Sequence, residues 1–228
     1  MKLYVGMIMA DGSDAFKRAQ IDLKNRLRLL DNRFGEHSPI NNDMLPNMPQ
    51  GSAVIVTQRV KKVLSLIQDI TQAEKKEIPF LLYGKNEGQI VFINEVDAEL
   101  DNLSAVEANH ATLVPGMQRF IRESKKDGSD IIVHGHSHPM TSEYNKSFSL
   151  ADMNAYKDFR LDNGVFRTGK IELCSCLLVD GNYNFLFFDG NDYYKFNDVF
   201  VQAENGDIIE QLPCYKKGLG LYRGNERG

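Results

Sequence analysis

Three of the chain's five histidines fall within five residues, at positions 134, 136 and 138. They follow the apolar run at 131–133, which is typical of a buried β-strand. Residues two apart on an extended chain project to the same side, so these rings could line one face. Asp152 lies 14 residues beyond His138, in a Ser-x-x-Asp pattern that predicts the first turn of a helix.

Two imidazoles at a strand end can bind one cation, and Asp152 is a candidate third ligand. A catalytic zinc ion is held by three protein side chains and leaves a fourth position for water. The alternative is that the histidines are ordinary hydrogen-bonding residues. Three of them beside a Ser-x-x-Asp pattern favour a metal site.

Two families carry a similar histidine motif. The sequence "GHSH" at 135–138 is similar to the late GHTH motif of calcineurin-like metallophosphoesterases. Those enzymes also carry Asp-x-His, Gly-Asp-x-x-Asp and Gly-Asn-His-Glu motifs, and this sequence contains none of them. That similarity therefore covers four residues only.

The second resemblance involves three separate elements. "HSHP" at 136–139, followed by Ser149-x-x-Asp152, resembles the signature of the JAMM (JAB/MPN) metalloprotease family. The family also has an upstream Glu-x-x-Gly-x-Leu-x-Gly segment, and "EIPFLLYG" at 77–84 supplies Glu77, Leu82 and Gly84 at matching offsets. The resemblance spans about residues 52 to 190.

The chain departs from this pattern at three places. Phe80 stands where the family has its first glycine, and His134 where it has a bulky or aromatic residue. We therefore expect His134 to support or pack against the ligands. The spacer between His138 and Ser149 is about three residues longer than usual, which makes Ser147 an alternative for the serine role.

The resemblance implies one Zn²⁺ ion held by His136, His138 and Asp152. Glu77 would take a proton from the attacking water and pass it to the leaving amine. Ser149 would hydrogen-bond the developing oxyanion. From residue type alone, Glu77 could instead be a solvated residue at a helix–strand junction, and Ser149 a simple helix N-cap.

The family chemistry is hydrolysis of an amide bond, often the isopeptide bond formed by ubiquitin or a ubiquitin-like protein. The implied partner is a protein or peptide substrate, selected by the segments at 94–116 and 140–148. Two alternatives remain open. One is a non-catalytic MPN-type scaffold that binds a partner protein, and the other is a metal-dependent hydrolase of another bond, such as a phosphoester.

Composition restricts the other function classes. The net charge is −4, so no overall positive field attracts nucleic acid. Three cysteines, an odd number, argue against a secreted disulfide scaffold, and Cys174 and Cys176 are expected to be core residues on one side of a strand. No apolar run reaches the roughly eighteen residues of a membrane-spanning helix. We expect a cytoplasmic protein.

Strand and helix patterns alternate along the chain. Strands are predicted near the start and at 53–57, 77–84 and 88–96, and the segment at 130–139 is predicted to be a strand that runs into a loop. Helices are predicted at about 14–33, 58–76, 114–128 and 149–161. A hairpin is expected across 181–182, followed by one or two strands at 192–202. The pattern predicts an α/β or α+β fold with a mixed central sheet flanked by helices. The resemblance makes this a cytidine-deaminase-like JAB/MPN sandwich.

Three regions are predicted. Residues 1–51 form a strand–helix extension and a linker that ends in a Pro- and Asn-rich stretch. Residues 52–200 form the catalytic domain. Residues 201–228 form a C-terminal strand and a Gly- and Arg-rich tail.

Overall fold

The computed structural model describes residues 45–98, 100, 113–124, 129–140, 147–162, 166, 168–190 and 192–214. The strand and helix predicted before residue 34, and the tail after 214, lie outside them. The described elements are β1 (Ala53–Thr57), α2 (Gln58–Glu74), β2 (Pro79–Glu87), β3 (Ile90–Ala98), α3 (Val114–Glu123), β4 (Asp130–Ser137), α4 (Leu150–Asp162), β5 (Ile171–Val179), β6 (Asn182–Phe188), β7 (Tyr193–Lys195), β8 (Val199–Gln202) and β9 (Ile208–Gln211).

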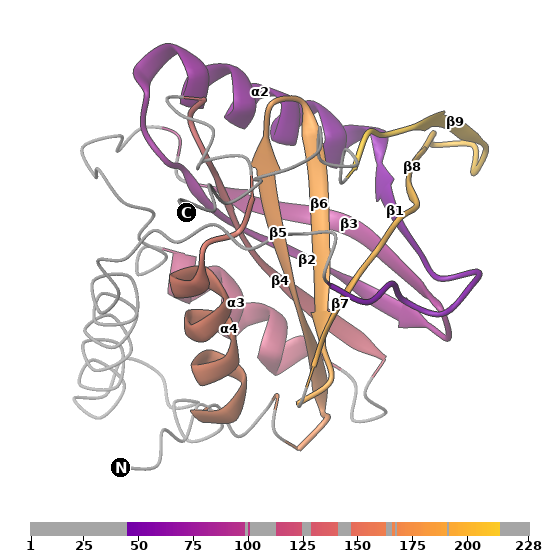
Figure 1. The fold of residues 1–228 in the computed structure, drawn as a ribbon. Coiled ribbons are helices and arrows are strands. Elements are labelled where there is room, and N and C mark those ends of the chain that lie inside the picture. Colours follow the sequence, from indigo (N-terminus) through magenta and orange to yellow (C-terminus); the bar gives the residue numbers. More distant parts are fainter. Residues whose placement is uncertain are drawn as a thin grey trace, which may run out of the picture.

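The strands form one mixed sheet in the order β7-β6-β5-β4-β2-β3-β1-β8-β9 (Figure 1). Only residues 196–198 separate β7, at one edge, from β8, near the other. The sheet must therefore curl so that its two ends approach each other. The mixed α+β character predicted from the sequence is confirmed.

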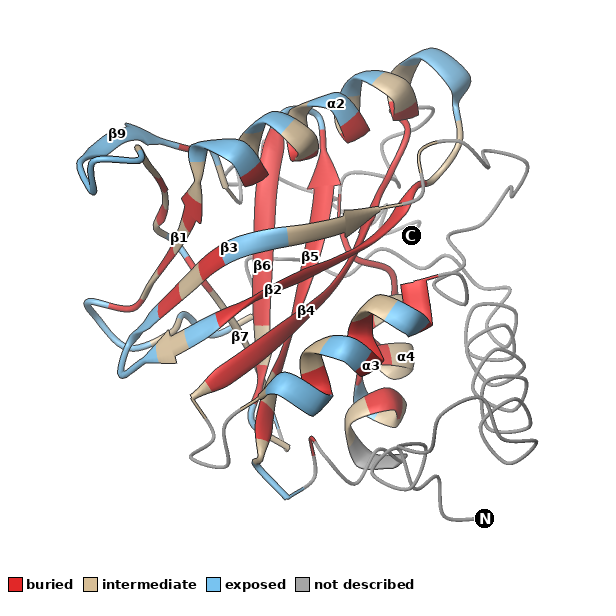
Figure 2. Cartoon of the chain, turned by 180° about the vertical axis from the view of Figure 1, so that it is seen from behind, coloured by how far each residue is buried: buried red, intermediate tan, exposed pale blue. Residues whose placement is uncertain are grey.

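Strand β4 lies in the middle of the sheet. It pairs antiparallel with β2 and parallel with β5, and all eight of its residues are buried (Figure 2). Hydrogen-bonded neighbours on both sides and packing on both faces explain the continuous apolar run at 131–133. The strand therefore holds its C-terminal end, where the histidines lie, in a rigid setting.

Helices cover the sheet on two sides. Helix α2 buries Val60, Leu64 and Ile67 against one face, in a cluster that includes Val133 of β4. Helix α3 packs on the other face, and its cluster contains Ile132 of β4 and residues of α4. Alternation along β4 thus directs odd-numbered side chains toward α2 and even-numbered ones toward α3 and α4.

The ends of three elements differ from the prediction. Strand β2 continues through Glu87, which pairs with Ile90, so the turn is Gly88–Gln89 and not 85–88. Helix α3 ends at Glu123 and not at 128, because Ser124 is extended and its hydroxyl donates to a carbonyl of the last turn. The β5–β6 turn is centred on 180–181, one residue earlier than expected, with left-handed backbone at both positions.

The region after β6 forms two separate strands, β7 and β8, within one continuous sheet. Strand β8 crosses position 200, and β9 extends the same sheet, so part of the predicted C-terminal segment is a sheet edge. The three-region division stays a prediction. Cys174 and Cys176 are both buried in the cluster under α2, as expected. In the described part of the chain, every helix is too short or too polar to cross a membrane.

Candidate metal centre

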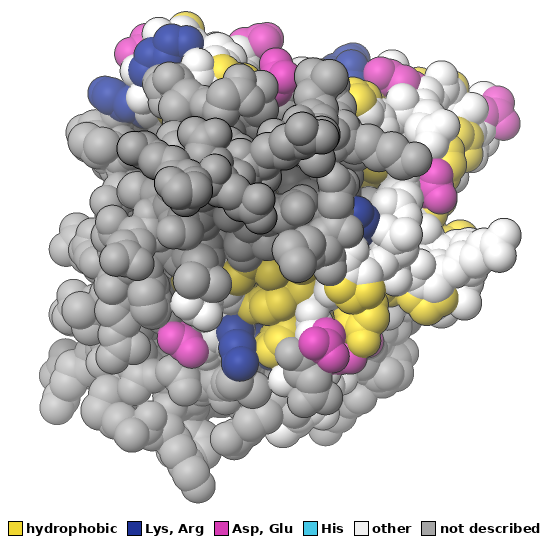
Figure 3. Space-filling model, viewed as in Figure 1, with side chains coloured by type: hydrophobic (Ala, Val, Ile, Leu, Met, Phe, Trp, Pro, Cys, Tyr) yellow, Lys and Arg dark blue, Asp and Glu magenta, His cyan; other side chains and the backbone are white. Residues whose placement is uncertain are grey.

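The two motif histidines meet at the end of β4. His136 lies one residue before the strand ends, and His138 follows it, held to β5 by a 2.9 Å hydrogen bond from its N–H to the Leu178 carbonyl. Their Nε2 atoms are 2.9 Å apart. Both side chains are buried, and no histidine is visible on the face drawn in Figure 3. The backbone thus directs two ring nitrogens to one point.

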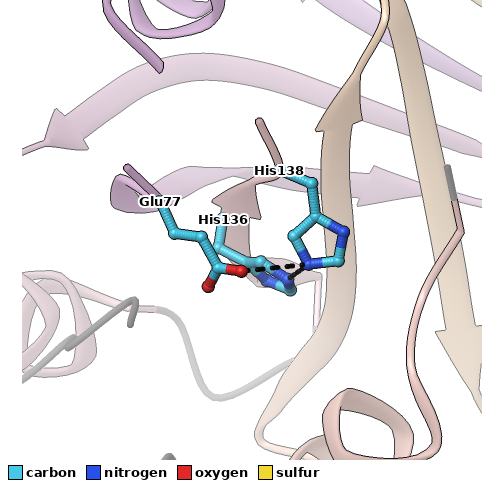
Figure 4. Close-up of side chains that lie close together, drawn as sticks. All are labelled: Glu77, His136 and His138. Carbon is cyan, nitrogen blue, oxygen red and sulfur yellow. Dashed lines mark hydrogen bonds and ion pairs between the residues drawn. The ribbon is translucent and has the colours of Figure 1, made fainter. Parts of the chain in front are cut away.

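Glu77 reaches the same point from the start of β2. Helix α2 ends at Glu74, and the left-handed backbone of the next residue, Lys75, turns the chain toward the sheet. Pro79 then pairs with His136 across the β2–β4 ladder. The Glu77 Oε1 atom lies 3.6 Å from His138 Nε2, and one ligand atom from each of Glu77, His136 and His138 lies within 4.8 Å of the others (Figure 4).

Asp152 approaches the imidazoles from the first turn of α4. Its Oδ1 is 3.4 Å from His136 Nε2, and its Oδ2 is 3.9 Å from His138 Nε2. It does not belong to the tighter group formed by Glu77 and the two histidines. The structure therefore brings together four of the five predicted site residues, with the rings buried and the carboxylates of Glu77 and Asp152 23% and 20% exposed.

Ser149 is the fifth predicted site residue, and it contacts Asp152. Its N–H and its hydroxyl each donate to Asp152 Oδ2 at 2.7 Å, and its Oγ accepts from the Asp152 N–H at 3.1 Å. This reciprocal arrangement is a capping box, in which each side chain bonds the other residue's backbone N–H. Ser149 therefore caps α4 and anchors the carboxylate. Because its only hydroxyl proton goes to Asp152 here, its oxyanion role stays a prediction. Ser147 is also buried.

Tyr156 is a site residue that the sequence analysis missed. Its hydroxyl lies 3.0 Å from Nδ1 of His136. When this hydroxyl accepts the Nδ1 proton, the Nε2 lone pair is left for a cation. Tyr156 follows Asp152 by four residues, and this spacing places both on one side of a helix. Helical spacing was thus the signal that could have identified it.

His134 packs beside this group without joining it. Its ring meets Tyr156 edge-on at 5.0 Å and Phe159 at 5.5 Å, centroid to centroid. The ring is buried and fills the space between β4 and α4. This agrees with the expectation of a packing role for His134. His37 and His110 lie outside the described residues.

The surroundings favour the ionisation states that metal ligands need. Burial lowers the pKa of His136, aided by the nearby His138 and opposed by the charge of Asp152. Burial opposes ionisation of Asp152, but the two imidazoles and the hydrogen bonds from Ser149 outweigh it, so the pKa of this carboxyl lies below its usual value. A neutral imidazole and an ionised carboxylate are the forms that bind a metal ion.

The residues present fit a divalent metal ion. Two imidazole nitrogens with carboxylate oxygens form a donor set that zinc and other first-row metals accept. Adjacent ligands of a tetrahedral zinc lie about 3.3 Å apart for bonds of about 2.0–2.1 Å. The separations of 2.9 and 3.4 Å at His136 Nε2 are close to that value. Glu77 Oε1 lies 3.6 Å from His138 Nε2, and Glu77, His136 and His138 form a group that could hold a metal ion.

Comparison with known proteins adds little to this geometry. No protein-family model and no curated protein matches the chain. Among solved structures, the chain is similar to the solution structure of protein DSY2949 from Desulfitobacterium hafniense, with 12% sequence identity and a TM-score of 0.43. The match covers 66% of this chain and 94% of that one. A likeness at this level carries no argument about function.

Proposed function

We propose that this chain is a zinc-dependent peptidase or isopeptidase of the JAMM type, with the JAB/MPN sandwich as its fold. The observation that carries the proposal is the meeting of Glu77, His136, His138 and Asp152 at one point. These residues come from three distant parts of the sequence, in the order that the family motif requires. The mixed sheet between α2 and the α3–α4 pair supports the fold assignment.

His136, His138 and Asp152 would hold the ion. Tyr156 orients the ring of His136, and Ser149 orients the Asp152 carboxylate. Such supporting hydrogen bonds keep ligands in place and raise affinity. When bound, zinc supplies a Lewis acid that polarises a carbonyl and lowers the pKa of water to near neutrality. Glu77 lies next to these three ligands and, not being needed to hold the ion, would be available for proton transfer.

Glu77 would act as the general base. Its Oε1 would accept a proton from the attacking water and transfer it to the nitrogen of the leaving amine, because amide cleavage needs that nitrogen to be protonated. Positioned acid–base groups of this kind contribute about 10²–10⁴-fold to rate. Both carboxylates are partly exposed, so water can reach the side of the site where they lie.

The substrate would be a protein or peptide, with the C-terminal tail of a ubiquitin-like protein as the first candidate. An extended tail can lie along a strand edge and form backbone hydrogen bonds. The segments predicted to select it, at 94–116 and 140–148, lie largely outside the described residues. A cytoplasmic location is part of the same proposal.

The test is a Glu77→Gln variant assayed on a panel of ubiquitin-like proteins fused through a Gly-Gly tail. We expect bound zinc to be retained and cleavage to fall by about 100-fold or more, because the amide has the shape of the carboxylate but accepts no proton. Glu74→Gln is the control: this residue is exposed near the end of α2, and its variant should behave like the parent.

Other outcomes would change the assignment. Parent-like cleavage by Glu77→Gln would remove Glu77 as the base, and loss of zinc would make it a ligand. A parent protein that binds zinc but cleaves no fusion would favour the non-catalytic scaffold. Release of phosphate from model phosphoesters would favour a metal-dependent hydrolase of phosphoester bonds.

A further inference from the structure

A second set of polar side chains lies behind the histidines, on the face of β4 that meets α2. Ser137 stands between His136 and His138, but its side chain points the opposite way, as alternation along a strand requires. It is fully buried, and its Oγ is 2.5 Å from Oγ1 of Thr71, which is buried in the last turns of α2. We call Thr71, Gln72 and Ser137 the α2 seam.

The α2 seam connects directly to Glu77. The Ser137 Oγ accepts the N–H of Ile78 at 3.0 Å, and the Ser137 N–H donates to the Ile78 carbonyl at 3.2 Å. The Ile78 N–H belongs to the peptide group that joins Glu77 to Ile78. One hydroxyl therefore sets the backbone from which the Glu77 side chain projects, and it sits on the residue between the two histidines.

Gln72 holds the chain on the far side of His138. Its Nε2 donates to the His138 carbonyl at 3.4 Å, and its Oε1 accepts the Met140 N–H at 3.1 Å. The amide thus bonds the backbone before and after Pro139. This segment has already left the sheet, so the bonds from α2 replace those that a neighbouring strand would supply.

We propose that Thr71 and Gln72 are positioning residues for the candidate metal centre, fixing Glu77 and His138 relative to each other from the opposite face of the sheet. This inference rests on the proposed metal centre, and both residues lie on α2, outside the JAMM-like motif. The physical reason is that the hydrogen bonds between Ser137 and Ile78 join the segment leading into β2 to the end of β4, next to the site. Loss of the Thr71 hydroxyl leaves the Ser137 hydroxyl free to reorient.

The first test compares Thr71→Val, which keeps the shape without the hydroxyl, with Thr71→Ser, which keeps the hydroxyl. Zn²⁺ affinity is measured by chelator competition, and Co²⁺ is substituted so that its visible absorption reports the ligand geometry. We expect Thr71→Val to weaken Zn²⁺ binding by about tenfold and to alter the Co²⁺ spectrum. Thr71→Ser should keep the affinity within about twofold and the parent spectrum.

Hydrogen exchange at the Ile78 amide gives a readout that needs no metal. This amide should lose protection in Thr71→Val and regain it in Thr71→Ser, because its acceptor is the Ser137 hydroxyl. If Thr71→Val unfolds more easily but binds Zn²⁺ with parent affinity and spectrum, Thr71 is only structural and its positioning role is wrong.

The second test uses a matched pair of glutamines on α2. Gln72→Met should weaken Zn²⁺ binding by about tenfold. Gln68→Met is the control, because Gln68 lies one turn earlier and donates to the Asn182 carbonyl at 3.2 Å, away from the histidines. Equal affinities in the two variants would overturn the role of Gln72, even if Thr71→Val fails to fold. A parent that binds Zn²⁺ without cleaving any fusion contradicts the proposed reaction alone.

Discussion

Single residues in the site owe their chemistry to burial and to one or two neighbours. His136 is buried against Phe148 and Tyr156, which disfavours its charged form. Asp152 keeps its charge because the two imidazoles beside it, together with two hydrogen bonds from Ser149 to one oxygen, favour the ionised carboxylate. On a solvated surface, the pKa values of a histidine and an aspartate would stay near their ordinary values. Their environment, and not their identity alone, prepares them to bind a cation.

The lowered pKa of His136 predicts how the metal-free protein responds to acid. The unfolded chain takes up this proton near the ordinary histidine value of about 6.5, and the folded chain takes it up only at lower pH. Below about pH 6.5 the unfolded state therefore binds more protons, and the free energy of unfolding should fall by at most about 1.4 kcal/mol per pH unit for this group.

Denaturant unfolding of metal-free protein between pH 7.5 and pH 5, a range set around the histidine value, measures this slope. His136→Gln removes the titrating ring and should give a shallower slope over the same range. An unchanged slope in that variant would show that other groups dominate the acid response.

At the scale of elements, β4 and the beginning of α4 carry three of the candidate ligands. A contact between β2 and β4 accounts for one departure from the JAMM pattern that the sequence resembles. Phe80 occupies the position of the first motif glycine and pairs with Gly135 across the ladder. A Cβ atom on Gly135 would lie 2.1 Å from the Phe80 ring. The missing side chain at 135 therefore provides the space that the Phe80 ring fills, one residue before His136.

This contact predicts a specific coupling between positions 80 and 135. Gly135→Ala should lower the free energy of unfolding by about 1–3 kcal/mol, because the added methyl group overlaps a buried ring. Denaturant unfolding provides the measurement. Adding Phe80→Leu to Gly135→Ala should cost less than the sum of the two single changes, since the smaller side chain relieves the overlap. Simple additivity would contradict the proposed contact.

Two element boundaries differ from those that local composition predicts. Residues 85–87 contain polar residues typical of a turn, yet they pair with β3 because the following Gly88–Gln89 pair closes a tighter hairpin. The early end of α3 at Glu123 depends on the hydroxyl of Ser124 and not on the glycine at 128. The first boundary thus depends on pairing between two strands, and the second on a hydrogen bond from Ser124 to the Ile121 carbonyl within the last turn.

For the whole molecule, the candidate metal centre joins three parts of the fold. Glu77 precedes β2, the two histidines end β4, and Asp152 begins α4. A cation held there would connect the paired strands β2 and β4 to helix α4, which otherwise only packs against one face of the sheet. Binding to the folded state alone stabilises it by mass action.

Metal binding should therefore raise the stability of the whole chain. At a free Zn²⁺ concentration about 100 times the dissociation constant, the free energy of unfolding should increase by about 2.7 kcal/mol. Thermal unfolding with added Zn²⁺, and again after chelation, measures the shift. His138→Gln removes one ligand and should respond much less. A parent protein whose unfolding is unchanged by Zn²⁺ would contradict the metal centre.

The residue types and their spacing indicated His136, His138 and Asp152 as candidate donors, because strand alternation and the first turn of a helix are local properties of a sequence. The resemblance to the JAMM pattern added Glu77. Residue types and spacing also determined the main helices and strands, whose apolar periodicity is local too. Only the tertiary structure decided that these donors meet, since the Pro79–His136 pairing and the packing of α4 join segments far apart in the chain. The supporting contacts of Tyr156 and Thr71 likewise arise from packing between elements, and their spacing alone does not specify a partner.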